Sequence, residues 1–350
     1  MYTTTRSRQI KVLIVDDSAL VRAILSEVIK SASDMEVVGA ASDPLQARDM
    51  IKLLAPDVLT LDVEMPKMNG LTFLERLMRL RPMPVLMISS LTERGSEMAL
   101  NALELGAVDF IAKPKLDVAA GLQRYADEII VKIRMAAESR VAQSHSRAEF
   151  PAPVLKSSKI STTEKLILVG SSTGGTEALK VFLEPMPADA PAIIIVQHMP
   201  EAFTRSFAAR LDGLCRMTVK EAEDQERVLP GHVYVAPGHS HVRVELSGAR
   251  YSLRLGSDAP INHHRPSVDA LFQSAVSTVG RNAVVVMLTG MGRDGAQGML
   301  QMRQAGAYTI AQDEATCVVY GMPRAAVEVG AVDEVLPLHA IARRVLETLA

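Results

Sequence analysis

Short apolar runs alternate with helical patterns along the first 135 residues, and this alternation constrains the fold more than any other feature of the chain. Five runs are predicted to form strands, at residues 12–15, 37–41, 58–61, 85–88 and 110–112. After the first run, Leu20, Ile24 and Val28 recur at i, i+4 and i+8, which is the spacing of one helix face. Similar segments follow the later runs. We therefore expect an α/β domain whose five parallel strands form a flavodoxin-like sheet covered on both faces.

A second, doubly wound α/β domain is expected from residue 164 onward. Four buried strands are predicted at residues 166–169, 192–196, 283–288 and 308–311. Between the second and the third of these strands, apolar and polar residues alternate in several stretches of residues 217–256. This alternation indicates strands with one exposed face, so we expect an antiparallel hairpin beside a mostly parallel sheet. A closing helix is predicted over residues 340–349.

The composition changes between the two domains. Residues 139–163 are rich in Ser, Lys, Arg, Ala and Pro and show no sustained apolar period, which is typical of a flexible linker. A chain of 350 residues is also long for one domain, because domains usually span about 100–200 residues. We expect domains at residues 1–135 and 164–350, joined by a linker at residues 136–163.

Charge and composition argue against several classes of protein. A formal net charge of −2 disfavours binding to nucleic acid through bulk positive charge, and no nucleic-acid partner is expected. The two cysteines, Cys215 and Cys317, make no disulfide framework, which fits a reducing compartment. The first apolar run stops at Asp16 and is too short for a signal peptide. Other apolar runs fall far short of the ~20 residues of a membrane helix, so we expect a cytoplasmic protein without membrane insertion.

Acidic residues follow two strands that should be neighbours in the N-terminal sheet. Asp16 and Asp17 end the first strand, and Asp62 ends the third. Ligands bind at the carboxyl ends of the strands in such sheets, and clustered carboxylates repel one another unless a cation lies among them. Oxygen ligands suit Mg²⁺, while Ser89 and Lys113 at neighbouring strand ends could hold phosphoryl oxygens. One Asp at a strand end is more often a helix cap, but the full set favours an aspartate that accepts a phosphoryl group.

A glycine-rich turn follows the first strand of the C-terminal domain. Residues 170–175, GSSTGG, link an apolar run to a helical pattern and fit the elbow that presents a serine nucleophile, for which we choose Ser172. His198 and Asp294 also follow apolar strands, so the three side chains should meet at one edge of the sheet. The chain order Ser, His, Asp differs from the order in α/β-hydrolases.

Other interpretations of these residues stay open at this point. A serine in a glycine turn is more often a helix cap, and His198 could belong to a structural loop. The turn could bind phosphate, although it lacks a Walker lysine. A metal site could use other histidines, although their spacing gives no support for it. The histidines in question are His232, His239, His241, His263 and His264.

The N-terminal motifs resemble those of response-regulator receiver domains. The resemblance rests on residues 15–18 (VDDS), residues 61–70 (LDVEMPKMNG) and residues 112–114 (AKP). Asn69 and Ser89 depart from the Asp and Thr that are frequent at these positions in the family.

This resemblance implies a role for each residue of the acidic site. Asp62 would accept a phosphoryl group from a histidine kinase. Asp17, Asp62 and the Glu64 carbonyl would bind Mg²⁺, and Asp16 would act through water. Two further residues would support the phosphoryl group, Ser89 and Lys113.

The C-terminal motifs resemble the catalytic domain of chemotaxis protein-glutamate methylesterases. They comprise residues 170–177, 197–200, 203–207, 264–269 and 288–295. The resemblance runs over nearly the whole chain, receiver and linker included. It implies hydrolysis of glutamyl methyl esters, and deamidation of glutamines, on the cytoplasmic regions of chemotaxis receptors during sensory adaptation.

The same resemblance implies a serine triad without a cofactor in the catalytic domain. Ser172 would be the nucleophile, His198 the base and Asp294 the residue that orients it. Thr173 and Met291 would support the triad or the oxyanion. Two sites in one chain suggest control, and we expect the receiver to block the edge of the sheet at Ser172 until it is phosphorylated.

Three rival functions follow from weaker features. The second domain could bind a partner without catalysis, but a binding module has no need for the three triad residues together. It could bind DNA, but the sequence shows no basic recognition helix. It could bind a nucleotide through residues 170–175, which a nucleotide titration would reveal.

Overall fold

The computed structural model describes residues 9–65, 68–89, 92–113, 119–139, 165–248 and 250–349. The chain divides into two compact units, Met1–Arg147 and Ala148–Ala350. The last helix of the first unit, α5 (Ala119–Glu138), continues past residue 135, where the first domain was expected to end. Most of the predicted linker lies outside the described residues.

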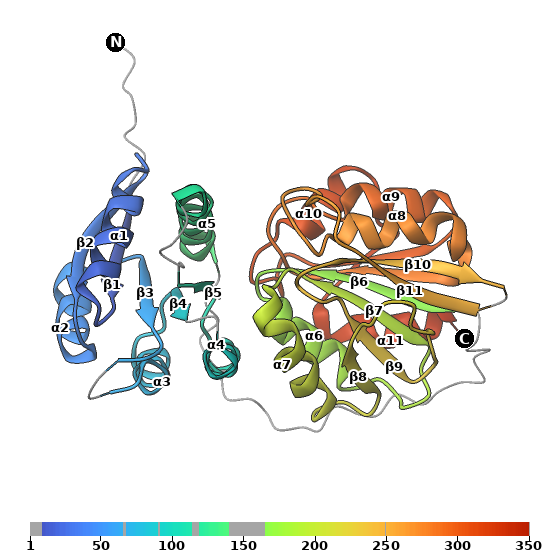
Figure 1. Cartoon of the computed structure of the whole chain (residues 1–350), viewed down its shortest axis with the longest axis horizontal. Helices are drawn as coiled ribbons and strands as arrows, with labels where there is room; N and C mark the ends of the chain where they lie inside the picture. The colour runs from blue at the N-terminus through green and yellow to red at the C-terminus, as the bar shows by residue number, and fades with distance from the viewer. Residues whose placement is uncertain are drawn as a thin grey trace, which may run out of the picture. The chain divides into compact units, whose positions relative to one another are not determined.

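The N-terminal unit contains a five-stranded parallel sheet in the order β2-β1-β3-β4-β5, as predicted. The strands are β1 (Ile10–Val15), β2 (Met35–Ala41), β3 (Val58–Asp62), β4 (Val85–Ser89) and β5 (Asp109–Ala112). Four helices precede α5, namely α1 (Ala19–Lys30), α2 (Pro44–Leu54), α3 (Gly70–Leu80) and α4 (Glu93–Glu104). Helices α1 and α5 cover one face of the sheet, and α2, α3 and α4 cover the other (Figure 1).

Polar side chains cap the helices that follow the strand ends. Ser18 accepts a hydrogen bond from the Val21 amide at the start of α1. Asn69 accepts one from the Leu71 amide, at 2.9 Å, at the start of α3. Because an amide oxygen caps a helix as well as a carboxylate does, the departure at Asn69 preserves this local structure.

The C-terminal unit contains a seven-stranded sheet in the order β14-β13-β12-β6-β7-β9-β8, and every neighbouring pair is parallel. The strands are β6 (Leu166–Ser171), β7 (Ala192–Gln197), β8 (Thr218–Glu221), β9 (His232–Val235), β12 (Ala283–Met287), β13 (Tyr308–Gln312) and β14 (Glu334–Leu336). A separate antiparallel pair is formed by β10 (His241–Ser247) and β11 (Arg250–Gly256). The predicted fold class is therefore confirmed.

Residues 217–256 hold more than the expected hairpin. Their first two strands, β8 and β9, pair in parallel and extend the main sheet, and only β10 and β11 form the hairpin. Alternation of apolar and polar residues reports one exposed face, which both kinds of pairing allow. The pattern alone therefore could not assign the direction of pairing.

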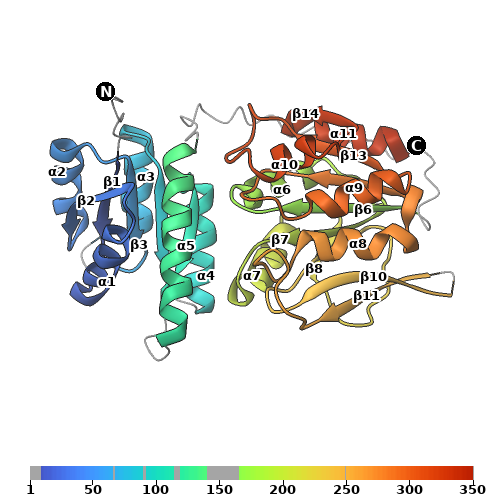
Figure 2. The same ribbon diagram turned by 90° about the horizontal axis from the view of Figure 1, so that it is seen from above.

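Helices cover both faces of the seven-stranded sheet. They are α6 (Gly175–Leu183), α7 (Glu201–Asp212), α8 (Val268–Thr278), α9 (Ala296–Gln304), α10 (Met322–Glu328) and α11 (Leu338–Leu349). Helices α8, α9 and α10 lie on one face, with α6, α7 and α11 on the other (Figures 1 and 2). Buried side chains such as Phe272 of α8 and Met287 of β12 fill the core between the layers.

The strand order places three strand ends side by side. Strand β6 lies between β12 and β7, and the chain leaves β6 toward β7 before it returns to β12 on the other side. A reversal of this kind opens a crevice at the carboxyl ends of the strands. The segments that follow these strands carry Ser172, His198 and Asp294.

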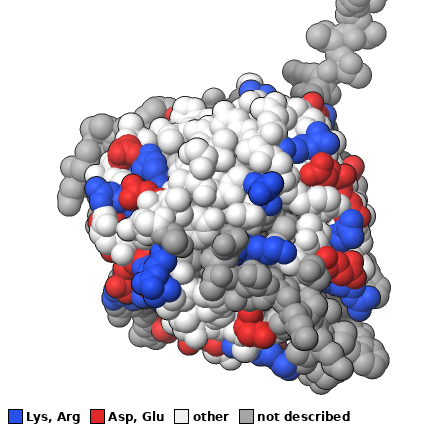
Figure 3. Space-filling model, turned by 90° about the vertical axis from the view of Figure 1, so that its right-hand side faces the viewer, with Lys and Arg blue, Asp and Glu red and all other residues white. Residues whose placement is uncertain are grey.

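The distribution of surface charge and the apolar character of the helices are the features that would indicate a nucleic-acid or a membrane partner. On the face shown in Figure 3, Lys and Arg side chains lie beside Asp and Glu side chains around a region with few charges. Among the described residues, no helix combines the length and the apolar character that crossing a membrane requires.

Candidate active site

The turn after β6 holds its two serines in different surroundings. Ser171 is fully buried, and its hydroxyl donates to Gln197 Oε1 at 2.7 Å. Ser172 is partly exposed, and its backbone is fixed because its amide donates to the Thr289 carbonyl at 3.0 Å. Gln197 Nε2 donates to the Ser172 carbonyl at 2.9 Å. The turn thus offers the Ser172 side chain at the sheet edge and uses Ser171 as a support.

Glycines make this turn possible. Gly174 has a φ of 76°, in the left-handed region that favours glycine. At Gly175, an added Cβ would lie 2.1 Å from Gln197 Oε1. At Gly290, an added Cβ would lie 2.8 Å from Ser172 Cβ, so the loop after β12 packs tightly against the serine. Thr173 directly follows Ser172, and Met291 directly follows Gly290, so both residues flank this contact.

His198 and Asp294 form a buried pair. His198 Nε2 lies 2.9 Å from Asp294 Oδ2, and the two side chains are 8% and 1% exposed. The other ring nitrogen, Nδ1, is buried and has no hydrogen-bond partner among the described residues. An ionised carboxylate on Nε2 favours the tautomer that carries its proton there, which leaves Nδ1 able to accept a proton.

The Asp294 carboxylate lies at the N-terminus of α8. Oδ2 accepts from the Val268 amide at 2.7 Å, and Oδ1 accepts from Ser267 Oγ and Asn262 Nδ2, both at 2.8 Å. Burial raises the pKa of this carboxyl, but its hydrogen bonds, led by that from His198, outweigh burial and hold the pKa well below its usual range. A helix N-terminus also stabilises an anion. Asp294 is therefore ionised when it faces His198.

Several residues around this pair were not predicted. Asp269 accepts from the Gly298 amide at 2.6 Å and from Asn262 Nδ2 at 2.7 Å, and the His264 ring stacks on the His198 ring. Burial and the nearby Asp294 raise the pKa of Asp269. Residues 264–269 were among the motifs that carried the family resemblance, and Ser267 begins a Ser-x-Asp pattern typical of a helix start, but neither signal indicated a contact with Asp294.

His241 contacts Ser267, the residue that caps the start of α8. It is fully buried, its Nε2 lies 3.1 Å from the Ala259 carbonyl, and its Nδ1 accepts from the Ser267 amide at 3.2 Å. Burial lowers the pKa of His241 by more than the hydrogen bond to Ala259 raises it. The folded chain therefore holds this ring in its neutral form.

The free energy of unfolding should fall in mild acid because of His241. With a folded pKa below that of the unfolded chain, the unfolded state binds the extra proton, so stability is lost as pH falls through about 6.5. Urea unfolding should show this loss between about pH 7.5 and 5.5, and His241→Phe should reduce the pH dependence. The matched variant, at exposed His339 of α11, is His339→Ala, which should retain it. Equal pH dependence in all three proteins would contradict the prediction.

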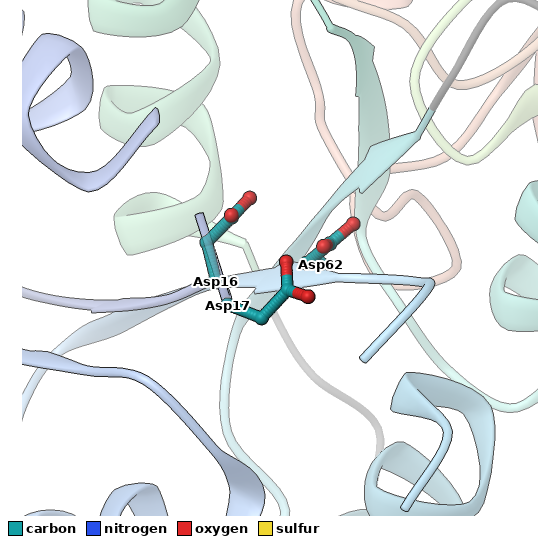
Figure 4. Close-up of side chains that lie close together, drawn as sticks. All are labelled: Asp16, Asp17 and Asp62. Atoms are coloured by element: carbon teal, nitrogen blue, oxygen red, sulfur yellow. The ribbon is translucent and has the colours of Figure 1, made fainter. Parts of the chain in front are cut away.

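Three carboxylates meet in the N-terminal unit. Oxygens of Asp16, Asp17 and Asp62 all lie within 4.8 Å of one another at the ends of β1 and β3 (Figure 4). Lys113 Nζ lies 2.8 Å from Asp62 Oδ2 and 3.4 Å from Asp16 Oδ2. Burial, with the charge of Asp16, raises the pKa of Asp62 to about 6 despite the lysine, and burial also raises the pKa of Asp16. One ammonium does not offset three acids, and this oxygen donor set fits a divalent cation such as Mg²⁺.

The remaining predicted residues of this site lie around the carboxylates. Glu64 is exposed, and its amide donates to Asp62 Oδ1 at 3.3 Å, so its backbone lies beside the acidic cluster. Ser89 is buried at the end of β4, and its hydroxyl donates to the Gly95 carbonyl of α4 at 2.9 Å. In the described part of the chain, the histidines considered above belong to no group of three or more metal-ligating side chains.

Comparison with known families finds a match in each of the two units of the chain. The receiver-domain model of response regulators matches residues 12–123, and the model of CheB methylesterases matches residues 167–345. The chain belongs to the CheB methylesterase family. The predicted family and its class of enzyme are therefore confirmed.

Individual relatives of this CheB family member match over nearly their full length. "Protein-glutamate methylesterase/protein-glutamine glutaminase 2" of Cupriavidus pinatubonensis is 63% identical, over 98% of this chain and 96% of the relative. "Protein-glutamate methylesterase/protein-glutamine glutaminase" of Thiobacillus denitrificans is 60% identical, over 98% and 97% respectively. The crystal structure of the Thermotoga maritima CheB methylesterase catalytic domain is 41% identical with a TM-score of 0.52, and covers 53% of this chain and 98% of its own.

Proposed function

We propose that this CheB family member hydrolyses γ-glutamyl methyl esters on cytoplasmic helices of chemotaxis receptors and deamidates glutamines there. The observation that carries the proposal is the buried pair of His198 Nε2 and Asp294 Oδ2, at 2.9 Å, next to the turn that presents Ser172, where the His198 amide donates to the Ser171 carbonyl at 3.1 Å. The names of the relatives, which include both activities, support the substrate class. The protein would act in the cytoplasm, where these receptor regions lie.

Acyl transfer through Ser172 accounts for both activities. His198 Nδ1 takes the hydroxyl proton while Oγ attacks the carbonyl carbon of the ester. Collapse of the tetrahedral intermediate breaks the bond to the methoxy oxygen, and the imidazolium returns the proton to give methanol. Water, activated by the same ring, then hydrolyses the glutamyl-enzyme to a carboxylate and free Ser172. A glutamine follows the same path with ammonia as the leaving group.

The charges at the site fit these steps. The ionised Asp294 stabilises the imidazolium that forms on His198, and it keeps the Nε2–H tautomer in place between turnovers. The oxyanion needs hydrogen-bond donors fixed before the reaction. We assign the oxyanion donors to the backbone around Thr173 and Met291. These residues directly follow Ser172 and Gly290, which pack tightly against each other.

Phosphorylation of the receiver would control this activity. Asp62 would accept the phosphoryl group of a histidine kinase, and Lys113 and Ser89 would hold its oxygens. Mg²⁺ bound by Asp17, Asp62 and the Glu64 carbonyl would neutralise charge during the transfer. A phosphoryl group that draws the Ser89 hydroxyl would remove its hydrogen bond to the Gly95 carbonyl, and so change the start of α4.

Methanol release from methylated receptor fragments tests both halves of the proposal. Acetyl phosphate with Mg²⁺ should raise the rate for the wild type by a factor in the range of about 5–150 that is typical of allosteric coupling. Asp62→Asn, or removal of Mg²⁺ with EDTA, should prevent the rise, because no phosphoryl group is then accepted. The matched variant Asp49→Asn, at an exposed position of α2, should respond like the wild type. A rise that survives in Asp62→Asn would contradict the regulatory role, and wild type that releases no methanol would contradict the esterase.

A further inference from the structure

The hydrogen bond to Asp294 does not by itself fix the orientation of the His198 ring plane. Within the described residues the ring makes its hydrogen bond through Nε2 alone, since Nδ1 has no hydrogen-bond partner. One hydrogen bond leaves a ring free to turn about the line of that bond, and such a turn would change the direction in which Nδ1 can accept a proton. The His264 ring lies flat against it, with centroids 3.7 Å apart and an angle of 9° between the planes.

A two-residue turn delivers His264 to this position. The amide and carbonyl of Ile261 and His264 exchange two hydrogen bonds, of 3.0 and 2.9 Å. Between them Asn262 and His263 have φ values of 51° and 68°, as turns with two left-handed central residues require. Residues other than glycine adopt this conformation at a cost, and such strain persists where surrounding contacts fix it.

The same turn reaches the carboxylate of the pair. Asn262 Nδ2 donates to Asp294 Oδ1 at 2.8 Å and to Asp269 Oδ2 at 2.7 Å. The amide thereby links two acids that would otherwise repel each other, and it fixes how the Asp294 carboxylate is turned toward His198. One short turn thus contacts both members of the buried pair, through different side chains.

We propose that the turn Ile261–His264 positions the catalytic pair, with His264 fixing the plane of His198 and Asn262 the orientation of Asp294. The proposal rests on the proposed function, in which Nδ1 of His198 is the base. In this proposal His264 transfers no proton. It acts through the contact between its flat ring and the ring of His198. The proposal therefore separates two properties of the residue, its aromatic surface and its nitrogens.

Two substitutions of His264 test this separation in the full-length chain. His264→Ala should lower kcat for methanol release by roughly tenfold to a hundredfold with little change in KM, because misplaced reacting groups slow the chemical step. His264→Phe, which keeps a flat ring and removes both nitrogens, should restore most of kcat. The control His339→Ala removes an exposed histidine of α11 and should behave as wild type. Unchanged kcat in His264→Ala, or equal loss in His264→Phe, would overturn the proposal.

The labelling rate of Ser172 by a fluorophosphonate gives a readout that does not depend on the receptor substrate. His264→Ala should slow labelling as it slows turnover, and His264→Phe should not. Asn262→Gly, which suits the left-handed backbone and removes only the side chain, should slow both reactions. Circular dichroism and thermal unfolding check that each variant is folded. Wild type that is neither labelled nor active would overturn the proposed function as well, whereas a labelled wild type with a normally labelled, folded His264→Ala would overturn this inference alone.

Discussion

Replacement of Ser172 by alanine should lower kcat for methanol release by roughly 10⁴-fold or more, because it removes the hydroxyl that attacks the ester. Its neighbour Ser171 is fully buried and donates to Gln197 Oε1 at 2.7 Å. The fold should tolerate the change, since the contacts that hold the turn use the backbone of Ser172, whose amide donates to the Thr289 carbonyl. Methanol release from methylated receptor fragments measures the effect.

A pair of controls makes this prediction specific. Phosphorylation of Asp62 by acetyl phosphate should continue in Ser172→Ala, because the change leaves the receiver sequence intact. Ser171→Ala should cost about 1–3 kcal/mol of stability, since Gln197 Oε1 loses its buried donor, and it should lower kcat far less. If Ser172→Ala retained turnover while Ser171→Ala lost it, the nucleophile would be Ser171.

The strands that carry the sites were predictable because they are buried on both faces. Runs such as residues 192–196 leave little choice beyond a strand in a covered parallel sheet, and they correspond to β7 and its neighbours. Residues placed just after such runs lie at one edge by topology alone. That is why Asp16 and Asp62, far apart in the sequence, could be expected to converge, as their oxygens do.

The surroundings of Asp294 could not be predicted in the same way. Its partners come from a segment around Ser267 that follows no strand of the main sheet, and they reach the carboxylate through the fold of a loop and the start of α8. No periodicity encodes such a meeting, because it depends on how a helix end and a turn approach a distant strand. The sequence likewise could not predict which ring nitrogen of His198 faces the Asp294 carboxylate; the structure shows that it is Nε2.

The groups around each carboxylate, rather than its depth of burial, explain why the pKa values of Asp62 and Asp294 shift in opposite directions. Asp62 and Asp294 are both about 1% exposed, yet burial raises the pKa of Asp62 to about 6 while hydrogen bonds hold that of Asp294 well below its usual range. Asp62 faces other acids and one lysine, whereas Asp294 faces amide, hydroxyl and ring donors. The negative charge at Asp62 is only partly balanced, which suits a carboxylate that would bind a cation and accept a phosphoryl group. The charge of Asp294 is stabilised by several hydrogen-bond donors, which suits a carboxylate that must remain ionised.

Asp294→Asn should lower kcat for methanol release by roughly 10³–10⁴-fold while the protein stays folded. The side chain keeps its shape but loses the charge that stabilises the imidazolium of His198. Its new amide nitrogen cannot accept the hydrogen bonds that now come from Val268 or from Asn262 and Ser267. At least one buried donor therefore loses its acceptor, at a cost of about 1–3 kcal/mol in the free energy of unfolding.

The pH dependence of this stability loss separates charge from shape. Folding lowers the pKa of Asp294, so its ionised form stabilises the wild type above the unfolded value of about 3.9, and this contribution is lost as pH falls further. The difference in unfolding free energy between wild type and Asp294→Asn should consequently shrink toward acid pH in urea titrations. Asp189→Asn, at an exposed position before β7, should match the wild type throughout. A difference that stays constant down to acid pH would mean that Asp294 acts through shape alone, and a kcat near the wild-type value would remove its charge from the mechanism.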